Sequence, residues 1–379
     1  MTRIIGLLMS CVLCFAGCSN AGTTISKDSS NSASSATQNE SNTSTPGLSK
    51  VGELPLTDRP DFSIDCVNEQ VCWLSTQKIL WQSVDGGKNW QEIYHTPGDE
   101  LILGYHFTNA AVGWSFSFSR LYKTEDGGRT WIHESSPLEG PNGEIRSLYF
   151  LADGKSGWLA GGLYRDQTKE ELKFGVPNNT KDVTGKRVLV EAIFHTADGG
   201  KTWQKSLNDG VWGRIRRIQF ANEKQGIALG NLAIYRSNDG GVTWNSSELN
   251  KSCVRREYVE QDYAISPLTL AMLDFKVIWI GYEDGGVIRS VDGGRHWCDV
   301  MSPEQMATKE AGWELFTAMH FDNAEHGWAL GDNRFLYETT DGGKTWSRVN
   351  SEIRFHDMKF IGLGRAFLVS DKDVYNLIR

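Results

Sequence analysis

The chain repeats one octapeptide six times, with the pattern Ser/Thr-x-Asp-Gly-Gly-x-x-Trp. The copies are SVDGGKNW at 83–90, TEDGGRTW at 124–131, TADGGKTW at 196–203, SNDGGVTW at 237–244, SVDGGRHW at 290–297 and TTDGGKTW at 339–346. Their acidic residues are Asp85, Asp126, Asp198, Asp239, Asp292 and Asp341. Asp-Gly-Gly is typical of a tight turn, because glycine adopts positive φ and the carboxylate accepts bonds from nearby N–H groups. The octapeptide therefore predicts a recurring hairpin turn, and the Trp after it fills the apolar gap beneath the turn.

A second repeated element precedes several of the octapeptides. Its copies include IRSLYFLADGKSGWLAGG at 145–162, IRRIQFANEKQGIALG at 215–230 and TAMHFDNAEHGWALG at 317–331. Each copy alternates apolar and polar residues, turns at a short polar segment and continues into a second strand. Together the two elements make a unit of four strands and about 40–45 residues, which is the size of one propeller blade.

The spacing of the octapeptides sets the number of blades. Units are expected at about 61–95, 101–135, 145–207, 215–250, 263–302 and 315–350. The third unit is too long for one blade and too short for two, so we expect an insertion at 163–190 with the character of a loop. A seventh unit at 356–379 has three strands and no octapeptide, and the N-terminal segment 49–56 can supply its fourth strand. The expected fold is all-β, one seven-bladed propeller over 49–379; the alternative is a six-bladed ring with a loose tail.

The octapeptide resembles the Asp-box, or BNR, repeat of sialidases, sortilin-type receptors, xyloglucan-cleaving hydrolases and the photosystem II assembly-factor family. The assembly-factor family is the most similar in length, in its single propeller and in its exported, often lipidated form. The resemblance covers about 50–379 and implies a propeller in which the octapeptide joins the third and fourth strands of each blade. It reaches only the repeats, so the photosystem itself is not implied as the partner.

The first residues have the character of an export signal. Arg3 precedes the apolar run 4–15, which ends in Phe15-Ala16-Gly17-Cys18. This resembles a bacterial lipobox, which implies a signal peptide at 1–17 and a lipid on Cys18; an ordinary signal peptide is the alternative. Residues 18–48 are rich in Ser and Thr and poor in apolar residues, as in a disordered tether. Ser19 after the Cys favours the outer membrane in a Gram-negative cell.

Four cysteines remain beyond Cys18 and the leader, and an exported chain permits them to form two disulfides. Aligning the blades places Cys66 where other blades have Phe, and Cys72 where other blades have Gly before a Trp. The two positions face each other across one hairpin, which predicts the pair Cys66–Cys72. Cys253–Cys298 follows by elimination.

Residues that break the repeat are candidates for a binding site. Arg146, Arg216 and His356 lie four residues before the repeated Phe or its equivalent, and Arg217 follows Arg216. Trp212 and Trp313 lie in segments that enter a first strand. Arg and Trp are common in binding hot spots, so we expect these six residues to form one face at the propeller mouth. The alternative is that the arginines pair with acids such as Glu144 and that each Trp packs on its own loop.

Composition and motifs limit the classes of function that the chain can have. The formal net charge of −8 disfavours a nucleic-acid partner. Each Asp-Gly-Gly turn offers one carboxylate, which is too few for Ca²⁺, so we expect no metal and no cofactor. The hypothesis is a lipid-anchored, non-catalytic scaffold that binds an envelope protein complex. The alternative is a sialidase-like or xyloglucanase-like glycoside hydrolase, or a carbohydrate-binding propeller, although no Phe/Tyr-Arg-Ile-Pro string of sialidases is present.

Overall fold

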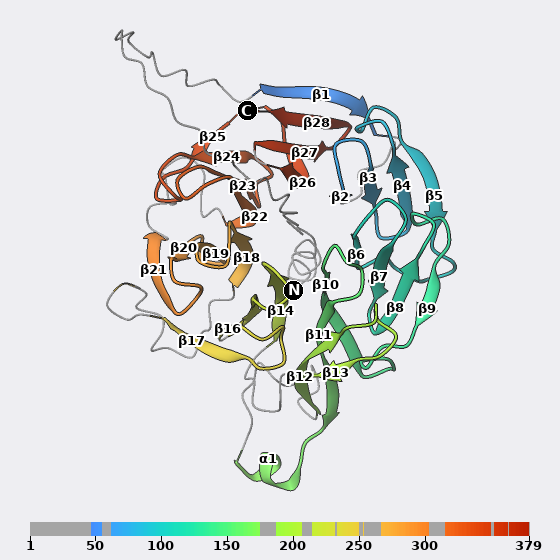
Figure 1. The fold of residues 1–379 in the computed structure, drawn as a ribbon, viewed down its shortest axis with the longest axis vertical. Coiled ribbons are helices and arrows are strands. Elements are labelled where there is room, and N and C mark those ends of the chain that lie inside the picture. The colour runs from blue at the N-terminus through green and yellow to red at the C-terminus, as the bar shows by residue number, and fades with distance from the viewer. Residues whose placement is uncertain are drawn as a thin grey trace, which may run out of the picture.

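The molecule is a ring of four-stranded blades around a central axis (Figure 1). The computed structural model describes residues 47–54, 62–174, 187–206, 214–231, 233–249, 253, 267–302, 315–349, 352–362 and 364–378. Within these residues seven blades are present, and the blades numbered 4 and 5 are joined into one eight-stranded sheet by their outer strands. The first strand of each blade lies nearest the axis and the fourth lies at the outer edge of the ring (Figure 1). The expected seven-bladed propeller is confirmed.

The blades follow one another in chain order. Blade 1 comprises β2 (Ser63–Cys66), β3 (Cys72–Ser75), β4 (Ile79–Ser83) and β5 (Gln91–His95). Blade 2 comprises β6 (Gly104–Phe107), β7 (Gly113–Ser117), β8 (Arg120–Thr124) and β9 (Ile132–Glu134). Blade 3 comprises β10 (Gly143–Phe150), β11 (Gly157–Asp166), β12 (Arg187–Thr196) and β13 (Gln204–Lys205). Blade 4 comprises β14 (Ile215–Phe220), β15 (Gly226–Gly230), β16 (Ile234–Ser237) and β17 (Asn245–Leu249).

The last three blades complete the ring. Blade 5 comprises β18 (Pro267–Met272), β19 (Ile278–Tyr282), β20 (Val287–Ser290) and β21 (His296–Met301). Blade 6 comprises β22 (Phe316–Phe321), β23 (Gly327–Gly331), β24 (Leu336–Thr339) and β25 (Ser347–Arg348). Blade 7 comprises β26 (Phe355–Gly362), β27 (Arg365–Ser370), β28 (Asp373–Ile378) and the N-terminal strand β1 (Gly47–Glu53). β1 pairs antiparallel with β28 from Gly47↔Ile378 to Glu53↔Asp373, so the expected closure by the N-terminal strand is confirmed.

The octapeptide forms the turn between the third and fourth strands. In blade 2 the Thr124 hydroxyl donates to Asp126 Oδ1 at 2.8 Å and accepts the N–H of Gly128 at 2.9 Å. The other carboxylate oxygen accepts the Thr130 hydroxyl at 2.7 Å. Both glycines have positive φ, as the turn requires. The hydroxyl-to-carboxylate bond recurs in the other five copies.

Aromatic rings connect neighbouring blades. Trp73 of blade 1 lies flat on Phe107 of blade 2 at 3.6 Å between ring centroids, and its Nε1–H donates to the carbonyl of Gly127 at 2.9 Å. Trp131, at the end of the blade 2 octapeptide, meets the edge of the same Phe107 ring. The second-strand Trp therefore packs on the next blade. The same flat stack recurs as Trp114–Phe150, Trp158–Phe220 and Trp279–Phe321.

The cysteines of blade 1 replace a packing pair that other blades keep. In blade 2, Phe107 and Gly113 are cross-strand partners, and a Cβ on Gly113 would lie 2.5 Å from Phe107 Cδ1. In blade 1 the partners at the same register are Cys66 and Cys72. The structure joins them in a disulfide, and a second disulfide joins Cys253 to Cys298.

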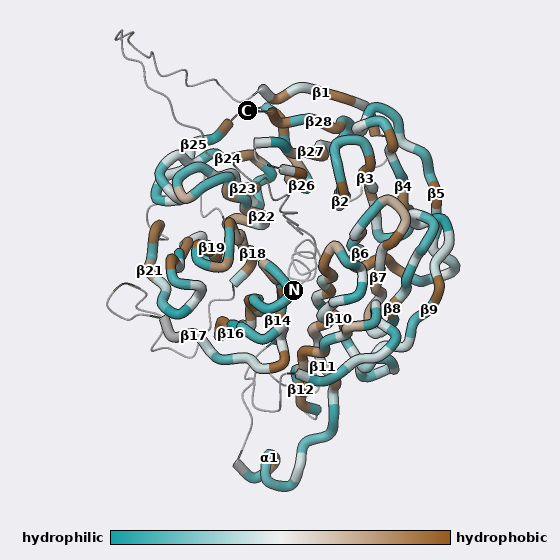
Figure 2. The backbone as a smooth tube through the Cα atoms, in the orientation of Figure 1, coloured by the Kyte–Doolittle hydropathy of each residue, from teal (hydrophilic) through white to brown (hydrophobic). Residues whose placement is uncertain are grey.

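The insertion in blade 3 differs from the expected loop. β11 and β12 are ten-residue strands that pair as far as Asp166↔Arg187, so both ends of 163–190 are strand. A short helix, α1 (Lys169–Phe174), follows β11, and residues 175–186 lie outside the described residues. We call the described part of this insertion, 163–174 and 187–190, the arm. It projects beyond the ring and is mostly hydrophilic (Figures 1 and 2). The sequence suggested a loop because its charged residues and glycines outweighed the short strand pattern.

Candidate functional site

Three of the expected site residues occupy equivalent positions around the ring. Arg146 on β10, Arg216 on β14 and His356 on β26 each lie at a β-bulge in the first strand. Thr317 of blade 6 lies at the corresponding bulge. A bulge leaves one residue out of the ladder and re-aims its side chain. The structure therefore places these side chains at one level, where each first strand begins; we call this level the rim.

In blades 2, 3 and 7 the residue before the rim position bonds to the preceding blade. Its N–H donates to a carbonyl in the turn between the second and third strands of that blade. The observed pairs are Ile102 to Gln77 at 2.7 Å, Ile145 to Phe118 at 2.6 Å and Phe355 to Arg334 at 2.6 Å. Blade 5 starts with Pro267, which has no N–H to satisfy.

In blade 3 the arm replaces this turn, and a side chain takes its role. Glu191 of β12 accepts the N–H of Ile215 at 3.1 Å. The Arg146 guanidinium pairs with Glu191, reaches Glu144 at 3.0 Å and donates through Nε to the Ile215 carbonyl at 3.0 Å. Burial raises the pKa of Glu191 to about 7, and Arg146 opposes this shift. Arg146 is thus a mostly buried ion-pair partner that links blades 3 and 4.

Arg216 is the more accessible of the two arginines on β14. Its side chain is 27% exposed, and it donates to Asn231 at 2.7 Å and to Glu283 of the neighbouring blade at 3.0 Å. Arg217 alternates with it along β14 and is buried. An exposed ion pair contributes little to stability, so Arg216 can exchange Glu283 for a partner's acid at small cost.

His356 lies on the far side of the ring from Arg216, and its side chain is buried. Its Nε2 lies 2.7 Å from Asp371 Oδ1, and its ring meets Phe62 edge-on at 6.0 Å. Trp212 and Trp313 lie outside the described residues. The structure thus brings Arg146 and Arg216 together in adjacent blades. It pairs each with an acid, as in the alternative that the sequence left open.

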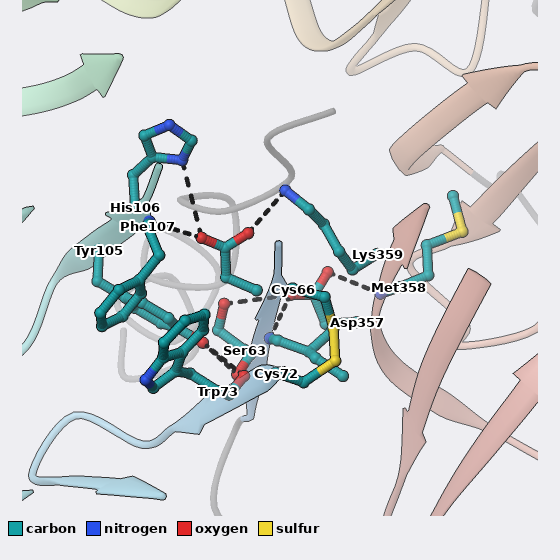
Figure 3. Close-up of polar contacts among 12 residues, drawn as sticks. Ser63, Cys66, Cys72, Trp73, Tyr105, His106, Phe107, Asp357, Met358 and Lys359 are labelled. Atoms are coloured by element: carbon teal, nitrogen blue, oxygen red, sulfur yellow. Dashed lines mark hydrogen bonds and ion pairs between the residues drawn. A yellow bond between two sulfur atoms is a disulfide. The ribbon is translucent and has the colours of Figure 1, made fainter. Parts of the chain in front are cut away.

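The structure also contains a buried charged cluster on the first strands, whose residues were not among the expected site residues. Asp65 of β2 lies 2.7 Å from Lys359 Nζ, accepts the N–H of Phe107 at 2.9 Å and lies 3.7 Å from His106 Nδ1. Figure 3 shows Lys359 and His106 converging from blades 7 and 2. Burial lowers the pKa of His106, which favours the neutral ring. The sequence does contain a signal for this cluster. In these blades the residue before the repeated Phe, or before its equivalent, is charged or polar although its strand is buried.

Asp357 completes this cluster. It accepts the Ser63 hydroxyl at 3.1 Å and the Ile64 N–H at 3.0 Å (Figure 3). The bonds cross from blade 7 to blade 1, where the ring closes. Asp357 and Asp65 are therefore each committed to contacts between blades.

The described part of the chain contains neither a metal-binding cluster nor a membrane-spanning helix. There, no group of three or more His, Cys, Asp or Glu side chains is placed to hold a metal ion. Among the same residues no helix has the length and apolar character needed to cross a bilayer.

Several known proteins are similar to this chain in sequence. The chain is a BNR-type β-propeller: residues 312–364 match the family model described as photosynthesis system II assembly factor YCF48. It is 25% identical over 304 residues to the photosystem II assembly lipoprotein Ycf48 of Trichormus variabilis, covering 73% of this chain and 83% of that protein. It is 24% identical over 285 residues to the chloroplastic photosystem II stability/assembly factor HCF136 of Arabidopsis thaliana, covering 67% and 69%. The chain therefore resembles the photosystem II assembly factors.

Solved structures show the same fold. YCF48 bound to D1 peptide superposes with a TM-score of 0.59 at 17% identity, covering 89% of this chain and 96% of that one. An ancestral GH74 enzyme superposes with a TM-score of 0.56 at 15% identity, covering 86% of this chain but 46% of the enzyme. At these identities the likeness concerns the fold alone.

Proposed function

We propose that the protein is an exported, lipid-anchored, non-catalytic scaffold that binds another envelope protein through the mouth of the propeller. The observation that carries the proposal is the similarity along most of the chain to proteins named as assembly factors and assembly lipoproteins. The rim supports it, because it presents the partly exposed cation Arg216 on an acidic protein. Such charges steer and select a partner more than they tighten its binding.

The anchor is part of the proposal. A signal peptide at 1–17, a lipid on Cys18 and a tether at 18–48 would hold the propeller beside a membrane, and in a Gram-negative cell we expect the outer membrane. The names of several relatives include the word lipoprotein, which supports this. Cys18→Ser should move the protein from the membrane to the soluble fraction on cell fractionation, whereas retention in the membrane would mean another anchor.

The rim is tested by partner capture from the native membrane. Arg216→Gln, and the double variant with Ala at Arg216 and Arg217, should weaken capture of an envelope complex and flatten its dependence on salt. Arg216→Gln is the sharper variant, because Arg217 is buried and its loss also strains the fold. Arg295→Gln, an exposed cation in the blade 5 octapeptide, is the matched control. Equal capture by Arg216→Gln and the control would place the site elsewhere.

If the protein is instead a glycosidase, it should hydrolyse a glycoside and capture no envelope complex. GH74 enzymes superpose through about half of their length, and this chain supplies one propeller. Turnover of a glycoside panel by the purified protein, with no co-purifying complex, would replace the scaffold with an enzyme. Binding of a glycan without turnover would instead indicate a carbohydrate-binding propeller.

A further inference from the structure

The contact between blades 6 and 7, which we call the 6–7 seam, differs from the seams that other tryptophans build. In blades 1, 3 and 5 the second-strand Trp donates its Nε1–H to an octapeptide carbonyl of the next blade. The pairs are Trp73 to Gly127, Trp158 to Gly240 and Trp279 to Gly342. Blade 7 has no octapeptide. Trp328 of blade 6 instead donates to Asp322 Oδ2 at 3.2 Å, so a carboxylate takes the place of a backbone carbonyl.

Asp322 is the centre of a buried cluster in the turn that follows β22. Its Oδ1 accepts the N–H of Gly364 of blade 7 at 2.8 Å and lies 3.2 Å from His320 Nε2. Its Oδ2 lies 3.0 Å from His326 Nδ1. The Asp322 side chain is 8% exposed, and the His320 ring stacks on Phe360 of blade 7 at 3.9 Å between ring centroids. The cluster therefore links blade 6 to the first hairpin of blade 7.

His326 joins Asp322 to a second carboxylate. Its Nε2 lies 2.7 Å from Glu338 Oε1 on β24, and its side chain is 4% exposed. Ionised carboxylates accept hydrogen bonds but do not donate them, so each of the two contacts needs an N–H on the ring. A neutral imidazole carries one N–H, whereas the imidazolium carries two. The two contacts together therefore require His326 in its protonated form.

The charge balance of the cluster depends on that proton. Burial opposes the ionisation of Asp322, but the bonds from His320 and His326 outweigh it and hold the pKa of Asp322 well below its usual range. With His326 protonated, a cation lies between the two carboxylates. Without the proton, both carboxylates face a neutral ring in a buried site, where charges interact more strongly than in water.

The neighbouring elements carry further charged groups. They are Glu325, which acts electrostatically on Arg289 of blade 5, Asp341, which accepts the Thr345 hydroxyl in its own octapeptide, and Arg365 and Lys359 of blade 7, which pair with Glu69 and Asp65 of blade 1. His320 is the second group in the cluster that can take up a proton, because its ring also contacts Asp322. A test of the cluster must therefore separate His326 from His320.

We propose that His326 is a pH-sensitive switch that tightens the 6–7 seam when it is protonated. The protonated ring holds Asp322 in the position that accepts the N–H groups of Gly364 and Trp328. The unfolded chain releases this proton near the ordinary value for histidine, about pH 6.5. The stabilisation is therefore complete below that pH, and it is lost as the pH rises and the proton leaves the folded protein. This device is independent of the scaffold function and adds pH control to the ring.

The test is urea unfolding of the full-length protein from about pH 5 to about pH 9. His326→Gln removes the titrating ring, so the ratio of its unfolding equilibrium constant to that of the parent should fall at least about tenfold across this range. Glu338→Gln should flatten the parent's profile in the same way, because a glutamine can donate to a neutral ring nitrogen. His320→Gln should keep the pH dependence. His133→Gln is the matched control, since His133 forms an exposed pair with Glu139 at 3.0 Å.

Hydrogen exchange locates the effect in the fold. After correction for the intrinsic rate at each pH, protection of the blade 7 strand 355–362 should fall as the pH rises in the parent and stay constant in Glu338→Gln. Protection of 143–150 in blade 3 should stay constant in both proteins. Unchanged protection of 355–362 in the parent would show that the proton does not act on the 6–7 seam.

Three unfolding results would overturn the inference. Parallel pH profiles of the parent and His326→Gln would mean that His326 does not titrate in this range. Loss of the pH dependence in His320→Gln would assign the switch to the other histidine, and loss in His133→Gln would mean that exposed pairs account for it. If His326→Gln does not fold, Glu338→Gln decides the question alone: a profile parallel to the parent's rejects the switch.

Discussion

At the scale of single residues, the octapeptide works through its carboxylate. Asp85 accepts the Asn89 side-chain N–H at 2.7 Å and the Asn89 backbone N–H at 3.0 Å. These bonds, with the Asn89 side chain first, lower the pKa of Asp85 to about 2. In Asp198 the Thr202 hydroxyl and backbone N–H have the same effect, again to about 2. The repeated Asp is thus a turn residue that favours its ionised form.

The carboxylates predict a pH dependence of stability. The pKa of Asp85 is lower in the folded state than its unfolded value of 3.8. The ionised carboxylate therefore stabilises the fold at pH values above 3.8, and this stabilisation is lost as the pH falls towards about 2. Asp85→Asn should be less stable than the parent at pH 7, and the difference should shrink between pH 4 and pH 2. Urea unfolding across this range measures it. A difference that stays constant with pH would mean that the charge of Asp85 does not matter.

At the scale of elements, stacked aromatic side chains hold neighbouring blades together. Trp158 lies on Phe220 at 3.4 Å between ring centroids, and its Nε1–H donates to the Gly240 carbonyl at 2.8 Å. One side chain of blade 3 therefore contacts both the first strand and the octapeptide of blade 4. Blade 4 has Ile227 where other blades have the second-strand Trp, so this Trp is missing from its contact with blade 5. There the outer strands β17 and β21 pair in parallel and join the two blades. The ring tolerates a seam without Trp when strand pairing replaces it.

Shortening the Trp158 side chain should separate packing from hydrogen bonding. Trp158→Ala should cost about 3–5 kcal/mol of unfolding free energy, because it leaves a cavity in a buried seam. Trp158→Phe keeps the stack and should cost about 1 kcal/mol for the lost bond. Denaturant unfolding measures both. Equal losses in the two variants would show that the bond, rather than the stack, holds the seam.

The arm is an addition to the ring rather than part of its support. Its helix is capped internally: Glu171 accepts the Thr168 N–H at 2.8 Å and both Arg165 guanidinium nitrogens at 2.7 Å. These contacts stay within the arm. The arm residues that contact the ring lie outside the segment 167–186: Arg214 donates to the Tyr164 hydroxyl at 2.7 Å, and Arg187 donates to the Asn142 side-chain oxygen at 2.6 Å.

Removing the tip of the arm should leave the propeller intact. Asp166 and Arg187 are cross-strand partners, so Asn-Gly can replace 167–186 as a two-residue hairpin turn. We expect Tm to change by only a few degrees, as measured by circular dichroism. Glu191→Ala is the contrast: it removes one of the two acids paired with Arg146 and leaves the buried Ile215 N–H without its acceptor, and we expect a loss of about 3–5 kcal/mol of unfolding free energy. A large fall in Tm without the tip would instead make the arm part of the fold.

At the scale of the whole molecule, closure depends on joining the two ends of the chain. β1 pairs with β28 along its length, and the Leu54 N–H adds a bond to the Lys372 carbonyl at 2.7 Å. Across the same closure Asp357 bonds to Ser63 and Ile64, and Lys359 pairs with Asp65. A closed ring exposes no inner sheet edge that could pair with another chain.

Deleting β1, residues 47–53, should open this closure. We expect Tm to fall by about 10 °C or more, since β28 loses its outer partner and Val51 leaves the blade 7–1 core. Deleting 19–46 is the control, because we expect removal of the proposed tether to leave the melting curve unchanged. If the two deletions have the same melting curve as the parent, closure by β1 is not what holds the ring.

Local chemistry, which can be read from the sequence, accounts for the turns, the number of blades and the disulfide of blade 1. Six copies of Asp-Gly-Gly specify their own turns, the blade count follows from their spacing, and Cys66 and Cys72 were expected to face each other because one hairpin sets their register. The tertiary structure alone decided the state of the rim. Arg146 pairs with Glu191, 45 residues away, and Arg216 pairs with Glu283, 67 residues away. Arg146 and Glu191 meet when the strands β10 and β12 of blade 3 assemble around the insertion, and Arg216 and Glu283 meet only when blades 4 and 5 pack. The buried Asp65–Lys359 pair forms only when the ring closes. No local spacing in the sequence relates any of these partners.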